Sequence, residues 1–188
     1  FLVVEDIDET AKLIDLSASF VMPGLMDMHV HLQGELGPDD DRQRLRMSSA
    51  DVLMESVHHA KLTLLAGFTT VRDVGSQSEE MYALRDAASK GWVLAPRIIA
   101  AGGVSVTGGH GDVDGMNPDL MEMYTSKTVC DGPYDCRRAT RRAIKFGADM
   151  IKITSTGGVL SDTNTGTAQQ MTNGELKEVV DTAHGLGR

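Results

Sequence analysis

From Pro23 onward, short apolar segments of the sequence alternate with longer segments that have helical periodicity. This alternation of strand, loop and helix predicts an α/β protein with a parallel sheet. The last helix opens with Thr172 and Glu175, which form a capping-box pattern. The predicted strands are Leu25–His31, Thr69–Val74, Arg97–Ala101 and Met150–Thr154, and the predicted helices are Ser49–Ala66, Ser78–Lys90, Asp135–Phe146 and a last one from Thr172 to near Gly185.

A parallel sheet of this kind can be doubly wound or can close into a (β/α)8 barrel. In both folds functional residues gather at the carboxyl ends of the strands. All four predicted strands end in polar residues, in the stretches HVHLQGE, VRDVGS, AAGGVSVTGGHG and KITSTGG. A doubly wound sheet usually has its site at one switch point, so four polar strand ends favour the rim of a barrel. Eight units need ~250 residues. We therefore expect the 188 residues to be about the first half of a TIM-like barrel, and a segment of a longer protein.

Composition excludes some classes of function. The net charge is −9, and no block of lysine and arginine forms a basic stripe, which argues against nucleic acid as a partner. No apolar run approaches the ~20 residues that span a bilayer, so we expect no membrane contact.

The two cysteines and the N-terminal segment carry weaker signals. Cys130 and Cys136 could form a disulfide or supply two thiolates, but this lone spacing is not that of a zinc knuckle. We interpret them as two unrelated thiols. Residues 1–22 alternate weakly and predict short antiparallel strands, with Asp15 and Ser17 near a turn.

The first predicted strand contains two histidines, His29 and His31, two residues apart. Residues i and i+2 of a strand point to the same face, so both imidazoles and Asp27 would lie on the inner face at the upper rim. Two neutral imidazoles there can bind one metal ion at ~2.0–2.1 Å. Alternatively, the pair is simply hydrogen-bonded to the backbone.

Two motifs indicate a family. PGLMDMHVH, from Pro23 to His31, and GFTTVRDVG, from Gly67 to Gly75, resemble the first two strands of the amidohydrolase superfamily. The resemblance implies a hydrolase on a distorted barrel with one or two divalent ions, usually zinc. Residues 1–22 would then be part of an N-terminal β-sandwich domain, and residues 23–188 the first four βα units of the barrel.

Lys152 lies between isoleucines on the fourth predicted strand, and burying a lysine is costly unless it is paired or neutralised. It could pair with Asp73. The resemblance implies instead that Lys152 reacts with carbon dioxide to give a carbamate that bridges two metal ions. His29 and His31 would complete this half of the site, with Asp73 as a supporting partner. Further ligands and the aspartate that serves as general base and acid lie outside this segment.

The loop Thr107–Gly111 and the stretch KITSTGGVLS resemble the subgroup of dipeptidases and carboxypeptidases that includes Xaa-Pro and Xaa-Arg dipeptidases and N-acyl-amino-acid hydrolases. In that subgroup a histidine at the position of His110 contacts the C-terminal carboxylate of the substrate. Gly108 and Gly109 would let backbone amides approach an anion.

Two other functions stay open. One is a deaminase or cyclic-amide hydrolase with a single metal ion, related to imidazolonepropionases, in which Lys152 is an ordinary lysine. The other is a metal-free barrel that serves as a binding module. The family implies a small peptide or acyl-amino-acid substrate and a homo-oligomer. A cytoplasmic location is favoured, with a periplasmic or secreted one open.

We interpret His58 and His59, on a helix away from the rim, and His184 as structural.

Overall fold

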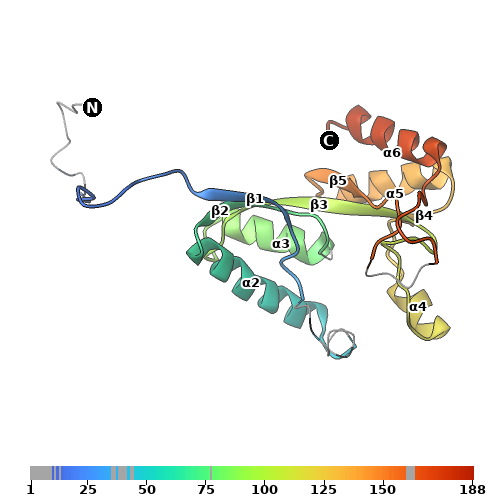
Figure 1. The fold of residues 1–188 in the computed structure, drawn as a ribbon, viewed down its shortest axis with the longest axis horizontal. Helices are drawn as coiled ribbons and strands as arrows, with labels where there is room; N and C mark the ends of the chain where they lie inside the picture. The colour runs from blue at the N-terminus through green and yellow to red at the C-terminus, as the bar shows by residue number, and fades with distance from the viewer. Residues whose placement is uncertain are drawn as a thin grey trace.

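The computed structural model describes residues 10, 12, 14–34, 37, 42, 45–76, 78–159 and 164–188. Within these residues a single parallel sheet has the order β1-β2-β3-β4, and β5 pairs with β3 as well. The strands are β1 (Leu25–Val30), β2 (Phe68–Asp73), β3 (Arg97–Val106), β4 (Val129–Cys130) and β5 (Met150–Ile153). This curved sheet with its helices confirms the predicted α/β half-barrel (Figure 1).

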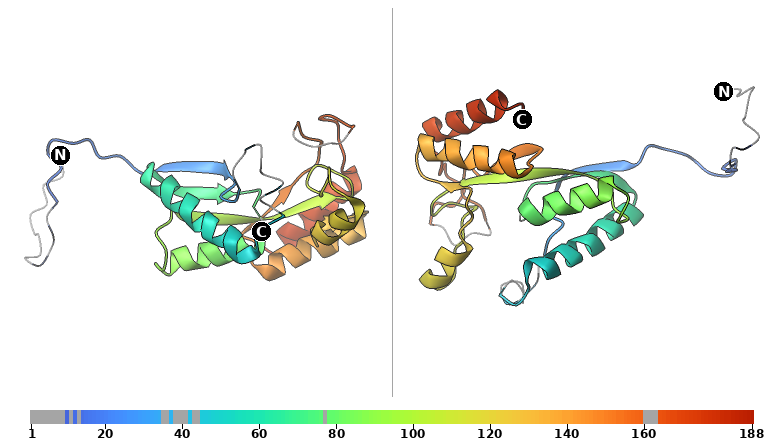
Figure 2. Two further views of the ribbon diagram at one scale, coloured as in Figure 1. Left: turned by 90° about the horizontal axis from the view of Figure 1, so that it is seen from below. Right: turned by 180° about the vertical axis from the view of Figure 1, so that it is seen from behind.

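α2 to α5 each connect one strand to the next, α6 follows β5, and four of these helices pack in two pairs. α2 and α3 contact each other beside β1, β2 and β3, and α5 contacts α6 beside β3, β4 and β5 (Figures 1 and 2). The helices are α2 (Ser49–Leu65), α3 (Ser78–Ser89), α4 (Pro118–Tyr124), α5 (Pro133–Phe146) and α6 (Asn173–Gly185). The four predicted helices are confirmed with ends that differ by two residues at most, and α4 was not predicted.

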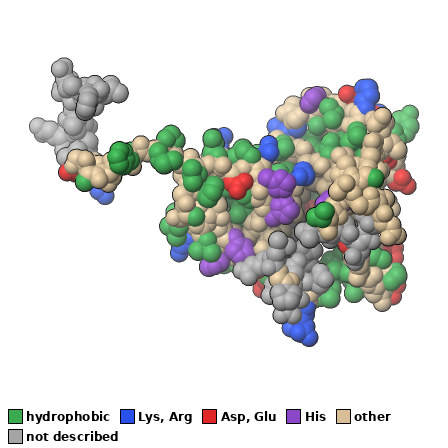
Figure 3. Space-filling model, in the orientation of Figure 1, with side chains coloured by type: hydrophobic (Ala, Val, Ile, Leu, Met, Phe, Trp, Pro, Cys, Tyr) green, Lys and Arg blue, Asp and Glu red, His purple; other side chains and the backbone are tan. Residues whose placement is uncertain are grey.

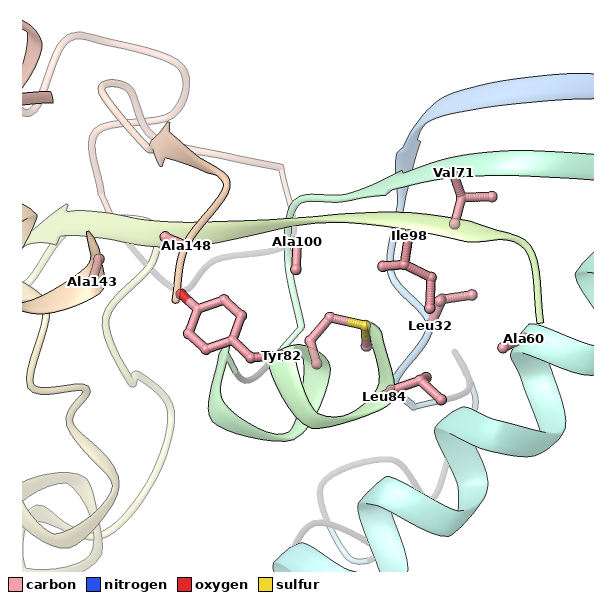
Figure 4. Packing of buried hydrophobic residues seen from close by; sticks show 10 residues of the cluster. Leu32, Ala60, Val71, Tyr82, Leu84, Ile98, Ala100, Ala143 and Ala148 are labelled. Carbon is pink, nitrogen blue, oxygen red and sulfur yellow. The ribbon is translucent and has the colours of Figure 1, made fainter. Parts of the chain in front are cut away.

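Two apolar clusters stabilise this arrangement. Figure 4 shows the first, where Leu32, Ile98 and Val71 from the strand side meet α2 and α3. The second lies between the far end of β3, β4, α5 and α6. Apolar area removed from water stabilises a fold by roughly 25 cal/mol per Å², so these clusters fix the sheet that carries the strand ends.

The far half of β3 differs from the prediction, which ended this strand at Ala101. β3 continues to Val106, because Ala101 to Val104 pair with β5, and Ser105 and Val106 pair with β4. The glycines at 102 and 103 had indicated a loop. Gly102 instead allows a close approach of α5 to β3, since a Cβ there would lie 2.6 Å from the Cβ of Ala143.

Cys130 and Cys136 form a disulfide, so the interpretation as two unrelated thiols is wrong. Cys130 ends β4, and α5 begins only three residues later at Pro133. The first turn of α5 brings Cys136 back toward the strand, with 4.9 Å between the two Cα atoms. Both residues are buried in the second cluster, which a spacing argument from sequence could not anticipate.

In the described part of the N-terminal segment the predicted strands are absent, and residues 1–9, 11 and 13 lie outside the described residues. Among its described residues, 10, 12 and 14–22, no strand is present, and these residues are exposed. The predicted turn is present, because Asp15 accepts a hydrogen bond from the backbone amide of Ser17 at 2.9 Å. The segment 14–24 extends away from the rest of the chain (Figure 2). In the part of the chain described, no helix has the length and apolar character needed to cross a membrane.

The capping box predicted for the last helix is confirmed. Thr172 is the N-cap of α6, and its hydroxyl accepts from the amide of Glu175 while Glu175 accepts from the amide of Thr172 at 2.7 Å. The other Glu175 oxygen accepts from the amide of Gly132 at 2.8 Å, which ties α6 to the start of α5. Burial alone would raise the pKa of Glu175, but these hydrogen bonds together hold the pKa below its ordinary value of 4.5.

We predict that Glu175→Gln lowers the free energy of unfolding by about 1 kcal/mol at pH 7, the size of a typical helix cap. The lowered pKa means that the ionised form stabilises the folded state above about pH 4.5 and that this contribution is lost as the pH falls through the lower folded-state value. Denaturant unfolding at several pH values should therefore show the two proteins converging below pH 4.5. Glu122→Gln, at an exposed position of α4, is the control. A gap that persists at low pH would contradict the assignment.

Candidate functional site

His29 and His31 lie side by side at the end of β1. Their ring centroids are 5.6 Å apart, and their planes differ by 16°. Figure 3 shows histidine side chains grouped near the middle of the molecular face, with a basic side chain beside them. With Zn–N bonds of ~2.0–2.1 Å, two imidazoles on one metal ion would have centroids roughly 5 to 6 Å apart. The spacing of the pair therefore fits a shared metal ion.

The backbone that carries the pair is not a regular strand. Asp27 pairs with Val71 and Val30 pairs with Asp73, so Met28 and His29 together stand opposite Arg72. Such a β-bulge bends a strand and redirects a side chain, and bulges are frequent beside active sites. Two side chains hold this bulge: Arg72 Nε donates to the carbonyl of Met28 at 2.7 Å, and Asp27 accepts from the amide of His29 at 2.9 Å.

Asp73 attaches the end of β1 to the loop that follows β2. Its carboxylate is 2% exposed and accepts from the amide of Leu32 at 2.7 Å and from the hydroxyl of Ser76 at 2.6 Å. The amides of Gly75 and Ser76 donate to the other oxygen. A buried carboxylate needs such partners. Asp73 therefore holds the backbone of Leu32, the residue after His31. None of these hydrogen bonds involves Lys152.

The ring of His31 packs directly on Gly75. A Cβ at position 75 would lie 2.1 Å from Cε1 of His31 and 2.2 Å from its Nε2. Glycine is therefore required for the ring to occupy this place. The sequence signal was present in the GFTTVRDVG motif, but it did not indicate which side chain this glycine would meet.

The electrostatic surroundings keep His31 neutral. Partial burial of the ring lowers the pKa of His31, the positive charges of His29 and Lys152 lower it further, and the carboxylate of Asp73 opposes them. A neutral imidazole keeps the lone pair that a metal ion requires. The pKa shift also shows that the charge of Lys152 acts on His31.

Lys152 lies on β5 opposite Gly103 of β3. It is half-buried, and a Cβ added at Gly103 would meet no atom within 4 Å. The space beside the lysine on the neighbouring strand is thus open. Lys152 is near enough to His31 for its charge to contribute to the lowered pKa of that histidine.

His110 lies in the loop after β3 and contacts the loop after β5. Its amide donates to the side chain of Gln170 at 2.8 Å, and its ring packs on Gly158, where a Cβ would lie 2.4 Å from Cε1 of His110. The amides of Gly108 and Gly109 donate to Asp112 and to the carbonyl of Val106. The amide of Gly108 thus approaches an anion of its own loop, the carboxylate of Asp112, and the amide of Gly109 is used by a backbone carbonyl. Leu160 and Ser161, at the end of KITSTGGVLS, lie outside the described residues.

His59 is closer to the site than its sequence position suggested. Its Nδ1 lies 3.1 Å from the carbonyl oxygen of Leu32, the residue next to His31. Because a carbonyl can only accept, Nδ1 carries the hydrogen. The prediction that His59 is remote from the rim is therefore wrong, and no pattern in the sequence indicated this contact.

The described residues contain no group of three or more histidine, cysteine, aspartate or glutamate side chains that could hold a metal ion. The donors that this part of the chain offers at the site are the two imidazoles and, once neutralised, Lys152. That these groups act as metal ligands stays a prediction.

A parallel half-barrel with paired histidines at the end of its first strand is the architecture expected of a barrel hydrolase. Residues 20–187 match the family model described as Amidohydrolase family. The chain belongs to the amidohydrolase family, as its two strand motifs predict.

Three relatives are similar to this chain over most of its length. Ochratoxinase from Aspergillus niger is 30% identical in an alignment 184 residues long that covers 87% of this chain and 36% of that protein. The structure of a Xaa-Pro dipeptidase with bound methionine in the active site has 38% identity and a TM-score of 0.75, over 88% of this chain and 41% of that one. A prolidase complexed with N-methylphosphonate-L-proline has 32% identity and a TM-score of 0.80, over 97% and 45%. The chain thus spans less than half the length of each of these relatives.

We predict that Gly75→Ala weakens zinc binding by the intact protein about 10-fold or more, because the added Cβ displaces the His31 ring and ligands must be held within roughly 0.5 Å. Gly185→Ala is the matched control, since it adds the same methyl group in open space at the end of α6, away from the site. Neither glycine has a positive φ, so strain does not separate the two variants. Calorimetric titration of the metal-free proteins with zinc measures the effect. Equal affinities in both variants would rule out the proposed contact.

Proposed function

We propose that this chain supplies part of the active site of a metal-dependent hydrolase that cleaves the amide bond next to a C-terminal amino acid. The observation that carries the proposal is the stacked pair of His29 and His31, with the charge of Lys152 acting on it. Family membership supports amide hydrolysis as the reaction class. The prolidase, the Xaa-Pro dipeptidase and the ochratoxinase support a small substrate.

His29 and His31 would hold one divalent ion through neutral imidazole nitrogens. An ammonium has no lone pair for a metal, so Lys152 would contribute only after its neutral amine adds to carbon dioxide, which forms a carbamate and releases one proton. The carbamate has two oxygens and could serve two zinc ions. Bound divalent ions lower the pKa of water and polarise a carbonyl group.

The surroundings of Lys152 support this proposal. The open space beside Gly103, which lies opposite Lys152 on the neighbouring strand, leaves room for the two oxygens of a carbamate. The change from a cation to an anion also removes the repulsion between Lys152 and the metal ions that the histidines would hold.

His110 would recognise the free carboxylate of the substrate. Its ring is oriented by Gly158, and its backbone by Gln170. Because the amides of Gly108 and Gly109 are engaged inside the loop, recognition would depend on the imidazole. This arrangement would restrict cleavage to the last amino acid of a peptide or of an acyl amino acid.

Metal content tests the proposal first. We predict close to two zinc ions per chain in the intact protein after extensive dialysis, and one or none in Lys152→Ala, because the variant lacks the bridging group. Lys61→Ala, on the exposed side of α2, is the control and should retain both ions. Elemental analysis gives the count. A wild type that holds only one ion, with the same content in Lys152→Ala, would favour a deaminase or a cyclic-amide hydrolase instead.

Substrate kinetics test the role of His110. We predict that His110→Asn raises KM about 10- to 100-fold for a dipeptide with a free carboxylate, the loss expected for one hydrogen bond to a charged group. KM for the same dipeptide with a C-terminal amide should change little. His184→Asn, at an exposed position near the end of α6, is the control. Equal effects on both substrates would contradict carboxylate recognition by His110.

A further inference from the structure

We propose that Arg72 and His59 are positioning residues that bracket the histidine pair. They bind the two backbone carbonyls on either side of it, Met28 before His29 and Leu32 after His31. The inference rests on the proposed metal site, because it explains how this site keeps its shape. It assigns a role to two side chains that lie on other elements, β2 and α2.

The need for such a bracket follows from the histidine rings themselves. Among the residues that the structure describes, no hydrogen bond fixes either imidazole of the pair, whose ring contacts are the mutual stacking and the packing of His31 on Gly75. The positions of the rings therefore depend on the backbone from Met28 to Leu32. A metal site requires that backbone to hold its ligands within roughly 0.5 Å.

Arg72 fixes the first end of this backbone segment. The bulge places Met28 and His29 opposite one residue of β2, which interrupts the regular ladder at this point. Arg72 Nε donates to the freed carbonyl of Met28 at 2.7 Å. The bond lies at an exposed place, so it acts by holding the backbone of the bulge in one geometry, and with it the direction of His29, and not by satisfying a buried carbonyl.

His59 fixes the other end. Leu32 is 3% exposed, and both of its backbone polar groups are bound by side chains: Asp73 accepts from its amide at 2.7 Å, and His59 donates to its carbonyl at 3.1 Å. The side chain of Leu32 lies in the first apolar cluster (Figure 4). The residue after His31 is thus held from three directions, and His59 contributes a hydrogen bond from α2.

Paired substitutions separate the hydrogen bond from the bulk of each side chain. Arg72→Gln keeps an N–H donor at the position of Nε, because both side chains have three carbons before that nitrogen, whereas Arg72→Met keeps the length and removes the donor. His59→Asn keeps a donor at the position of Nδ1, and His59→Leu removes it. Each variant is made in the intact protein.

We expect Arg72→Met and His59→Leu to bind zinc about 10- to 100-fold more weakly, the range found when a residue that supports a metal ligand is changed. Arg72→Gln and His59→Asn should stay within about threefold of the wild type. Nuclear magnetic resonance of the metal-free proteins should show shifted imidazole signals of His29 and His31 in the first two variants only. Thermal unfolding reports any general loss of stability.

The outcomes separate this inference from the proposed function. Unchanged zinc affinity and unchanged imidazole signals in Arg72→Met and His59→Leu would overturn the bracket, even if both proteins were less stable. Losses as large in Arg72→Gln and His59→Asn would also overturn it, because the donor atoms are kept. If the wild type binds no zinc, the proposed function fails, and the imidazole signals of the metal-free variants still decide the positioning role.

Discussion

The candidate site depends on how the end of β1 is attached to its neighbours. Within the described residues β1 pairs with β2 alone, so one backbone ladder, itself interrupted by a bulge, holds the strand that carries both histidines. The buried carboxylate of Asp73 compensates for this by joining Leu32 to the loop after β2. Ionised groups are buried at a high cost unless they are fully hydrogen-bonded, and Asp73 meets that condition through backbone amides and Ser76.

Glycines complete the site by bringing backbone and ring into contact. Gly75 lies under His31, and Gly158 lies under His110, so in both places a loop approaches an imidazole where a Cβ could not be accommodated. The two loops follow β2 and β5, while the rings come from β1 and from the loop after β3. Each histidine is therefore positioned by an element next to its own in the sheet, which couples the order of the strands to the geometry of the site.

Regular features of the sequence were sufficient to predict most of the fold. The alternation of apolar strands with capped helices is local information, and the strands at Leu25, Phe68, Arg97 and Met150 begin within one residue of their predicted starts. The features that were missed depend on tertiary contacts. β3 continues through Gly102 because α5 packs on that glycine, and Cys136 meets Cys130 because the first turn of α5 returns to β4. Neither contact leaves a periodic signal.

The same division applies to the site. Residue type and strand position made His29 and His31 candidate metal ligands, and the family resemblance added Lys152. The argument from alternating side chains assumed a regular strand, whereas Met28 and His29 form a bulge opposite Arg72. The rings nevertheless stack at 5.6 Å, so their common direction comes from the bulge, from Gly75 and from the anchored Leu32. The sequence of β1 thus determines which two side chains are the candidate ligands. The orientation of these two imidazoles depends on β2, on α2 and on the loop between β2 and α3.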